Sequence, residues 1–330
     1  MDETERLITT GTGTDAAPAP GGAGWRVWTE DWDPAYGTPA TFEVDDSAEV
    51  EQAEAGGGHV APAAVQAVPL CFVDGRRRAE LSLWAEHAAT GTRVPCLVGA
   101  YAVGAVTIRP GGPATYGGIR IGRLAIWGGG HTGDVVAPGR RWVSTSTTTL
   151  EPAELLAHLQ DRMRAAEGVL ALDAAALGWH VVLDGPLNRI RSLHGLVTGY
   201  VKTHHRQILP DDAHALVPTL ALGARTRIYA AGTDRYTCYT RVGYGGRGAS
   251  PWGGIARLEF PSVAGIDAVA ERATQLASVL GRYAGIAHRD PRAPVNLTPV
   301  RNLERHLSRL MGPVGLATRA ARDAVIGSAA

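Results

Sequence analysis

Two aspartates of this 330-residue chain stand directly before a glycine at the end of an apolar run, Asp74 in CFVDG and Asp184 in VVLDG. Ligands of open α/β sheets bind beyond the ends of strands, so a carboxylate at that place is a candidate metal ligand. Asp-Gly is also a common turn pair, and either aspartate taken alone favours the turn.

Glu167 strengthens the metal hypothesis because it interrupts an apolar stripe. It lies four residues after Met163 and three before Leu170 in a segment with helical spacing. An ionised carboxylate that faces a core is costly unless it is paired or bound to a metal. A pairing with Arg164 at the edge of the stripe is the alternative. Carboxylate oxygens are the ligands that Mg²⁺ or Mn²⁺ prefers, and two such ions, roughly 3.5–4 Å apart, can activate a water against a phosphodiester.

The loop AHRDPRAP offers a further ligand, His288 or Asp290. We therefore expect Asp74, Glu167 and Asp184 to hold the metal, with one of these two residues closing the site. Aspartate before proline is also typical of a turn, so the fourth ligand stays open.

Basic residues follow both candidate aspartates. Lys202 is the only lysine, and lysine and arginine are not interchangeable at a compact phosphate site. It is a candidate active-site cation, and its survival by chance is the alternative. Contacts to a nucleic-acid backbone are expected from the clusters after each aspartate. The residues expected to make these contacts are Arg76, Arg77, Arg78, Arg189, Arg191, His204 and Arg206, and Arg241 is expected to support them.

The formal net charge of zero is a cancellation. Residues 1–70 hold 13 Asp and Glu against two Arg, a net of −11, and the rest of the chain carries +11. A basic body is typical of a protein with a polyanionic partner, and a solvated arginine surface is the alternative. Residues 1–65 are predicted to be an acidic, largely flexible leader, which either shields a basic groove or acts as a solubilising tail.

Several classes are excluded by what the sequence lacks. No apolar run approaches 18 residues, and the start MDETERLITT is no signal peptide. Three distant cysteines fit a reducing cytoplasm rather than a disulfide framework. The chain has no G-x-x-x-x-G-K-[ST], H-E-x-x-H or G-x-S-x-G motif, which argues against a phosphate-loop enzyme, a zinc hydrolase and a serine hydrolase.

The elements that must position these residues form a mixed pattern. VPLCFVDG predicts a buried strand and a turn, after which RRRAELSLWAEH either continues the strand or returns along it. Two further β-rich runs complete an antiparallel meander. A helix over 151–177, a buried strand over 180–187, and a helix or strand within 188–209 come next. Later strands, a helix over 267–283 and the helix NLERHLSRLMG complete a mixed α/β sheet.

This ordered combination resembles the NurA nuclease domain, an RNase H-like family. The resemblance is carried by FVDG around Asp74, the helix with Glu167, VVLDGPL around Asp184, GLVTGYVKTH around Lys202, and the late segment YTRVG…ARLEFP with Tyr239, Arg241 and Glu259. It implies an RNase H-like mixed β-sheet flanked by helices over 66–312, after the leader 1–65 and before a C-terminal tail 313–330.

The resemblance also implies an activity and partners. Members look like metal-dependent nucleases that process DNA ends, typically with manganese, as dimers with HerA-type hexameric ATPases. Asp74, Glu167 and Asp184 would be metal ligands and Lys202 a catalytic cation. Where the family has a C-terminal histidine, the stretch PVNLTPVR has Arg301. A catalytically weak nucleic-acid-binding scaffold of a translocase complex is therefore the alternative, and no feature separates DNA from RNA.

Overall fold

The computed structural model describes a part of the acidic leader and most of the chain after it, namely residues 43–44, 50–64, 67–86, 93–187, 195–204, 206–245, 249–286, 288–290 and 292–328. The flexibility predicted for the leader therefore concerns residues that are largely outside the described ones. Within the described chain, no helix is long and apolar enough to cross a membrane.

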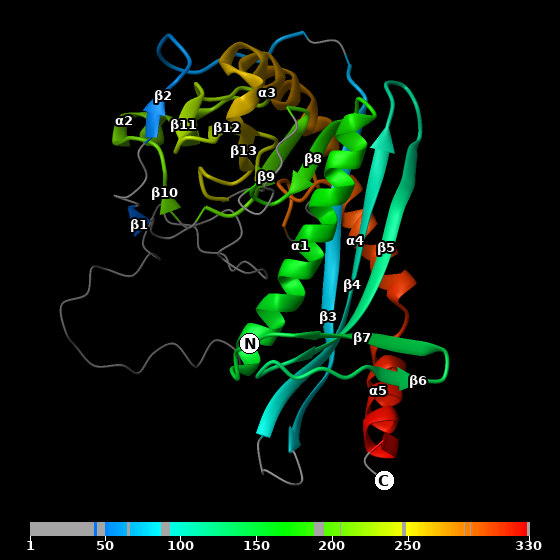
Figure 1. Cartoon of the computed structure of the whole chain (residues 1–330). Helices are drawn as coiled ribbons and strands as arrows, with labels where there is room; N and C mark the ends of the chain where they lie inside the picture. The colour runs from blue at the N-terminus through cyan, green and yellow to red at the C-terminus, as the bar shows by residue number, and fades with distance from the viewer. Residues whose placement is uncertain are drawn as a thin grey trace, which may run out of the picture. The chain divides into compact units, whose positions relative to one another are not determined.

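The centre of the fold is a five-stranded unit in the order β5-β4-β3-β8-β9 (Figure 1). β3 (Leu70–Glu86), β4 (Arg93–Ile108) and β5 (Ala114–Trp127) form the antiparallel meander that the sequence predicts. β8 (His180–Asp184) lies parallel to β3, and β9 (Val197–Val201) lies parallel to β8. The predicted mixed α/β sheet is confirmed.

Shorter strands extend this unit at both edges into an eleven-stranded sheet. Beyond β9 come β13 (Ile255–Pro261), β12 (Arg235–Arg241), β11 (Tyr229–Ala231) and β2 (Val50–Gln52), and beyond β5 come β7 (Arg140–Ser146) and β6 (Val135–Ala137). β1 (Glu43–Val44) and β10 (Arg206–Gln207) form a separate parallel pair. Because β2 belongs to the main sheet, the folded part begins before the predicted boundary at residue 66.

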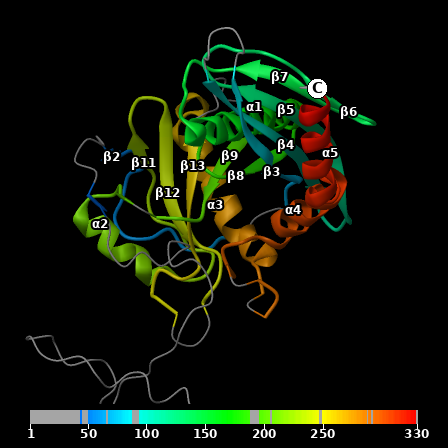
Figure 2. The same ribbon diagram turned by 90° about the horizontal axis from the view of Figure 1, so that it is seen from below.

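Helices cover both faces of the central strands (Figure 2). Alternation along β3 directs Cys71 and Val73 toward α1 (Pro152–Ala176), while Leu70 and Phe72 pack with α3 (Ile266–Leu280) and α4 (Thr298–Met311). α1 begins with a proline in its first turn and matches the predicted helix. The other helical segments are α2 (Asp211–Leu216), α5 (Val314–Ser328) and the 3₁₀ turns Val217–Thr219, Ser262–Ala264 and Gly281–Tyr283.

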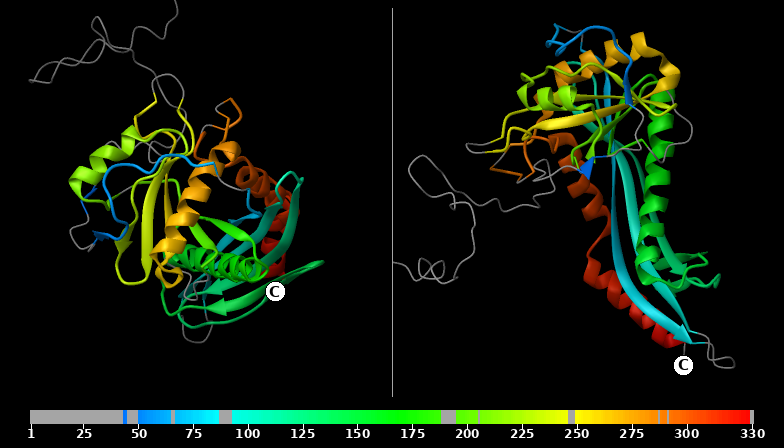
Figure 3. Two further views of the ribbon diagram at one scale, coloured as in Figure 1. Left: turned by 90° about the horizontal axis from the view of Figure 1, so that it is seen from above. Right: turned by 90° about the vertical axis from the view of Figure 1, so that its left-hand side faces the viewer.

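The residues assigned to a C-terminal tail are ordered as α5. Ala317 and Ala321 of this helix are buried in one cluster with Cys96 of β4 and Trp142 of β7. Figure 3 shows α5 beside the far part of β3 and β4. The small side chains on its inner face let the helix approach the strands closely.

The turn expected at Asp74 and Gly75 is wrong, because β3 continues through both residues to Glu86. Asp74 pairs with Gly104 of β4 and Gly75 pairs with Val103, so the sheet satisfies the backbone groups that a turn would have used. Gly75 serves another purpose: a Cβ at this position would lie 2.5 Å from Glu167 Oε1. Its missing side chain makes room for that carboxylate.

Candidate functional site

Asp74 and Asp184 lie on neighbouring parallel strands at the same level. β8 ends at Asp184, and the register pairs Val73 with Leu183, so Asp74 and Asp184 follow directly on this pair. Both positions alternate to the face that carries Phe72 of β3. The structure therefore brings the two predicted aspartates together across two strands.

Lys202 joins this pair from the end of β9. Its Nζ donates to Asp184 Oδ2 at 2.7 Å and to Asn296 Oδ1 at 3.1 Å, and the lysine is only 7% exposed. Asn296 in turn donates from Nδ2 to Asp290 Oδ2 at 2.6 Å. A chain of polar contacts thus runs from Asp184 through the lysine and the asparagine to Asp290.

Glu167 reaches the cluster from α1. Arg164 NH1 donates to Glu167 Oε2 at 2.8 Å and to the backbone oxygen of Asp184 at 2.7 Å, which ties the helix to the end of β8. The pairing with Arg164 is present, but Glu167 is fully buried, so the alternative of a glutamate that reaches solvent at the edge of the stripe is wrong. The pairing does not remove Glu167 from the site, because the same arginine holds it beside Asp184.

The three carboxyl groups remain only partly satisfied. Asp74 Oδ2, Glu167 Oε1 and Asp184 Oδ1 are all buried and have no hydrogen-bond partner within the described part of the chain. Burial raises the pKa of Asp74 well above its ordinary value, and the carboxylates of Asp184 and Glu167 raise it further. Burial also raises the pKa of Glu167 to about 7, against the opposing effect of Arg164. Buried polar atoms without protein partners are places where a water, an ion or a ligand can bind.

The donors fit a hard divalent ion, but their arrangement is not that of a formed metal site. Over the residues that the structure describes, no group of three or more His, Cys, Asp and Glu side chains is placed to hold a metal. Asp184 faces Lys202, and Glu167 faces Arg164. The chemical fit rests on the three unpartnered oxygens, which are the ligand type that Mg²⁺ and Mn²⁺ take.

The two candidates for a fourth ligand, His288 and Asp290, differ in burial and in their partners. His288 is exposed, and its Nε2 accepts from Arg289 Nε at 3.1 Å, so it takes no part in the cluster. Asp290 is 3% exposed and belongs to the polar chain through Asn296. Arg301 lies with its Nε 3.5 Å from Asp290 Oδ2. The arginine therefore neutralises the one candidate that lies near the site.

Comparisons with known proteins add little to this geometry. No protein-family model matches the chain, and no curated protein matches it. Among solved structures, the NurA nuclease from Sulfolobus solfataricus aligns over 77% of this chain and 86% of its own, at 12% sequence identity and a TM-score of 0.42. A likeness of this degree assigns neither a family nor an activity. The function proposed below rests on the side chains of the chain itself.

The arginines after Asp74 divide by strand alternation. Arg76 is exposed on the same face as Asp74, whereas Arg77 faces α1 and donates to Gln160. Arg78 pairs with Glu80 at 2.7 Å and donates to the backbone oxygen of Met311 at 3.0 Å. Arg78 thus holds α4 against β3, and a contact of this side chain with nucleic acid stays a prediction.

The basic residues that follow Asp184 also differ in their environment. Arg189 and Arg191 lie outside the described residues, and Arg206 is exposed on β10. His204 is 1% exposed, with Nε2 3.1 Å from the backbone oxygen of Ile255. Arg241 is 4% exposed and donates to the backbone oxygens of Pro218, Leu220, Pro251 and Gly253. The predictions for His204 and Arg241 are wrong because both side chains are buried in the fold.

Glu259 makes the supporting contact that the late strands were expected to supply. Its Oε2 accepts from the backbone N–H of Leu187 at 2.8 Å, and its Oε1 accepts from Arg257 at 2.6 Å. Leu187 follows Asp184 by three residues, so this contact fixes the segment that leaves the site. Burial raises the pKa of the Tyr239 phenol, against the opposing effect of the same Arg257.

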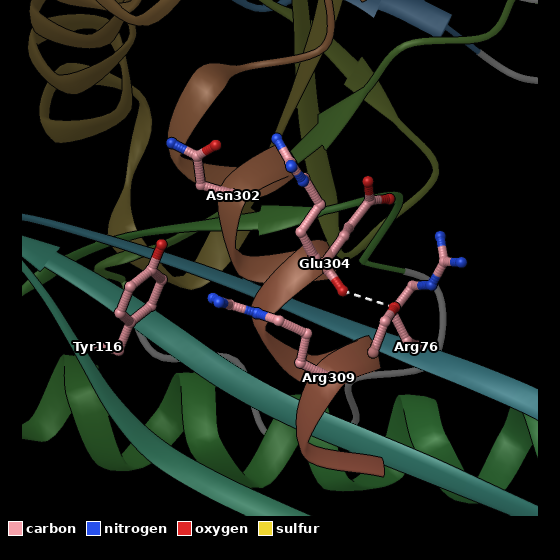
Figure 4. A pocket seen from close by; sticks show the side chains of 7 residues that line it. Arg76, Tyr116, Asn302, Glu304 and Arg309 are labelled. Atoms are coloured by element: carbon pink, nitrogen blue, oxygen red, sulfur yellow. Dashed lines mark hydrogen bonds between the residues drawn. The ribbon is translucent and has the colours of Figure 1, made fainter. Parts of the chain in front are cut away.

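A hollow of about 480 Å³ lies beside α4 and was not anticipated (Figure 4). It is lined by Arg76, Tyr116, Asn302, Glu304, Arg305, Ser308 and Arg309. In Figure 4, Tyr116, Asn302 and Arg309 lie to one side of the helix, and Glu304 and Arg76 to the other. The spacing of Arg301, Arg305 and Arg309, four residues apart on a predicted helix, is the signal that could have revealed a basic stripe.

Proposed function

We propose that this protein is a divalent-metal-dependent nuclease that hydrolyses phosphodiester bonds at DNA ends. One observation supports the proposal above the others. Asp74 and Asp184 lie on adjacent strands, Arg164 ties Glu167 to the end of β8, and each of the three acids keeps a buried oxygen with no hydrogen-bond partner in the described chain. Acids in excess of cations in a buried place are the natural receptor for a cation.

Asp74, Glu167 and Asp184 would hold Mn²⁺ or Mg²⁺, with Asp290 behind them. Such an ion, when bound, activates a water and stabilises the leaving oxygen of the phosphodiester. Lys202 holds its proton-bearing Nζ between Asp184 and Asn296, and it would bind a phosphate oxygen of the scissile group. Arg164 orients Glu167 and the end of β8 at the same time.

The direct test is cleavage of end-labelled single- and double-stranded DNA with Mn²⁺. We expect the wild type to cut and an Asp74→Ala, Asp184→Ala double variant to be inactive. Asp173→Asn is the matched control, since Asp173 lies on α1 with its side chain 57% exposed and pairs with Arg120. A wild type that cuts no better than the double variant would exclude the enzyme.

A catalytically weak nucleic-acid-binding scaffold is the second candidate. It is favoured by the ion pairs that occupy Asp184 and Glu167, and by the absence of an arranged metal group over the described residues. Calorimetric titration with Mn²⁺ separates the two. The nuclease requires a site that is lost in Glu167→Gln, whereas the scaffold requires DNA binding without such a site.

The same proposal extends to assembly and location. A cytoplasmic homodimer that works with a HerA-type hexameric ATPase is the arrangement that the resemblance implies. Light scattering of the full chain, alone and mixed with such an ATPase, measures both associations. A monomer that does not shift the ATPase peak would remove this part of the proposal and leave the nuclease test unaffected.

A further inference from the structure

Three arginines on the outer side of α4 and the adjoining strand have no counter-charge of their own. Arg76, Arg305 and Arg309 are exposed, and none of them has a hydrogen bond or ion pair from its side chain to any residue that the structure describes. All three line the hollow of about 480 Å³. Glu304 is the one acid in this lining, and it is paired with Arg292 at 3.1 Å. The hollow is therefore a cationic surface.

This surface adjoins the carboxylate cluster. Arg76 follows Asp74 by two residues on β3 and so projects from the same face of the sheet. Gly104 lets α4 approach the strands, since a Cβ there would lie 3.2 Å from both Leu303 and Leu307. The inner face of α4 thereby packs on β4 at the position that pairs with Asp74.

An aromatic ring stands at the far side of the same hollow. Tyr116 of β5 is 42% exposed and stacks on His306 of α4, with ring centroids 4.4 Å apart and planes 11° from parallel. The histidine fixes the orientation of the tyrosine ring from one side. Exposed aromatic rings beside arginines are the elements with which proteins bind unpaired nucleotides.

We propose that the outer face of α4 binds a single-stranded polynucleotide, with Arg76, Arg305 and Arg309 on its phosphates and an unpaired base stacked on Tyr116. The strand then passes from the tyrosine toward Asp74. The paired bases of a duplex hide their faces in the stack, so a stacking platform discriminates in favour of single strands. That the bound strand is also the one cleaved rests on the proposed function.

The test is fluorescence anisotropy of a labelled oligothymidylate and of a matched duplex, with the full chain and a chelator present. We expect Arg305→Ser with Arg309→Ser to weaken single-strand binding and to reduce the slope of log K against log salt by about 1.4. The control is Arg319→Ser with Arg322→Ser, which removes two exposed arginines of α5. Equal losses in the two double variants would overturn the proposal.

Tyr116 provides the second, independent measurement. Tyr116→Ala is expected to weaken oligothymidylate binding about tenfold, whereas Tyr116→Trp keeps it, because stacking needs only a ring. Duplex affinity should change by less than about twofold in both variants. A tenfold loss on the duplex as well, or no loss on the single strand, would overturn the stacking.

These measurements separate this proposal from the nuclease. Binding is measured without metal, so an inactive wild type that still loses oligothymidylate affinity in the α4 variants supports the binding face and removes the enzyme. Unchanged binding in the α4 variants together with Mn²⁺-dependent cleavage removes the binding face and keeps the enzyme. Circular dichroism of each variant confirms that it is folded.

Discussion

Two regions of this molecule bury charge, and they do so in opposite ways. Arg225, which is 2% exposed, donates to both carboxylate oxygens of Glu54 at 2.6 and 2.9 Å, to Thr274 at 3.0 Å, and to the backbone oxygens of Thr226 and Ala270. Every nitrogen of its guanidinium group has a partner. This is the pattern of a structural ion pair, in which burial is tolerated because nothing is left unsatisfied.

The carboxylate cluster at the end of β8 and on the adjoining part of β3 is unsatisfied by comparison. Asp74, Glu167 and Asp184 meet two cations, Lys202 and Arg164, and three of their oxygens have no partner among the described residues. An unsatisfied buried acid destabilises the fold and is retained where it has a ligand to bind. The difference teaches that the Arg225 pair is complete in itself, whereas the acids beside β8 keep three oxygens that a ligand can still bind.

The largest expected effect is on the satisfied region. Arg225→Met removes one partner of a buried pair and leaves Glu54 with a half-buried charge, so the free energy of unfolding should fall by about 3–5 kcal/mol. Urea unfolding followed by circular dichroism measures it. Since Arg225 is remote from the acids, calorimetric Mn²⁺ binding by the folded variant should be unchanged. A loss below about 1 kcal/mol would contradict the structural assignment of this pair.

The next effect is on the activity of the unsatisfied region. Asp74→Asn removes a proposed ligand and should lower Mn²⁺-dependent DNA cleavage by about 100-fold or more, since even changes behind a ligand cost about 10- to 100-fold. The same variant should keep or raise the thermal midpoint, because it removes one of three crowded carboxyl groups. A variant that loses both activity and stability would show that Asp74 is structural, like Arg225.

The sequence was sufficient for the central strands and for the positions of the two aspartates and Glu167 on their elements, because these signals are local. The apolar runs before Asp74 and Asp184 predict neighbouring strands, and helical spacing places Glu167 on the inner face of α1. Parallel pairing of β3 with β8 then brings the aspartates together. Ordered short motifs were enough because each element presents its acid at a place that its own periodicity defines.

The wrong predictions concern residues whose structure is determined by contacts with segments that are distant in the sequence. Asp-Gly at residue 74 has the local signature of a turn, but pairing with β4 overrides it. Arg241 looked available for phosphate, yet four backbone oxygens from two separate segments surround it. Glu54 was assigned to a flexible leader and instead pairs with Arg225, 171 positions away. No local pattern predicts such a partner.

A smaller effect sharpens the comparison through stability alone. Glu167→Gln keeps the shape of the side chain but cannot ionise. Burial raises the pKa of Glu167 to about 7, so above that pH the wild type carries a buried charge that the variant lacks. The metal-free variant should therefore be more stable than the wild type above that pH, by about 1 kcal/mol. Saturating Mn²⁺ should reverse the order, since about 100-fold excess over Kd stabilises only the protein that binds it, by about 2.7 kcal/mol. Equal stabilisation of both proteins by Mn²⁺ would place the ion elsewhere.

The smallest effect is expected where charge is not buried. Arg120 and Asp173 join β5 to α1 at 2.9 Å, with side chains 46% and 57% exposed. Water solvates both groups whether or not they pair, so Arg120→Ser should change the free energy of unfolding by less than about 0.5 kcal/mol. Urea unfolding at low and at high salt measures it, with the Arg225→Met variant in parallel. If Arg120→Ser lowered the free energy of unfolding as much as Arg225→Met, complete hydrogen bonding would not distinguish the Arg225 region. The three unpartnered oxygens would then be no argument for a functional site.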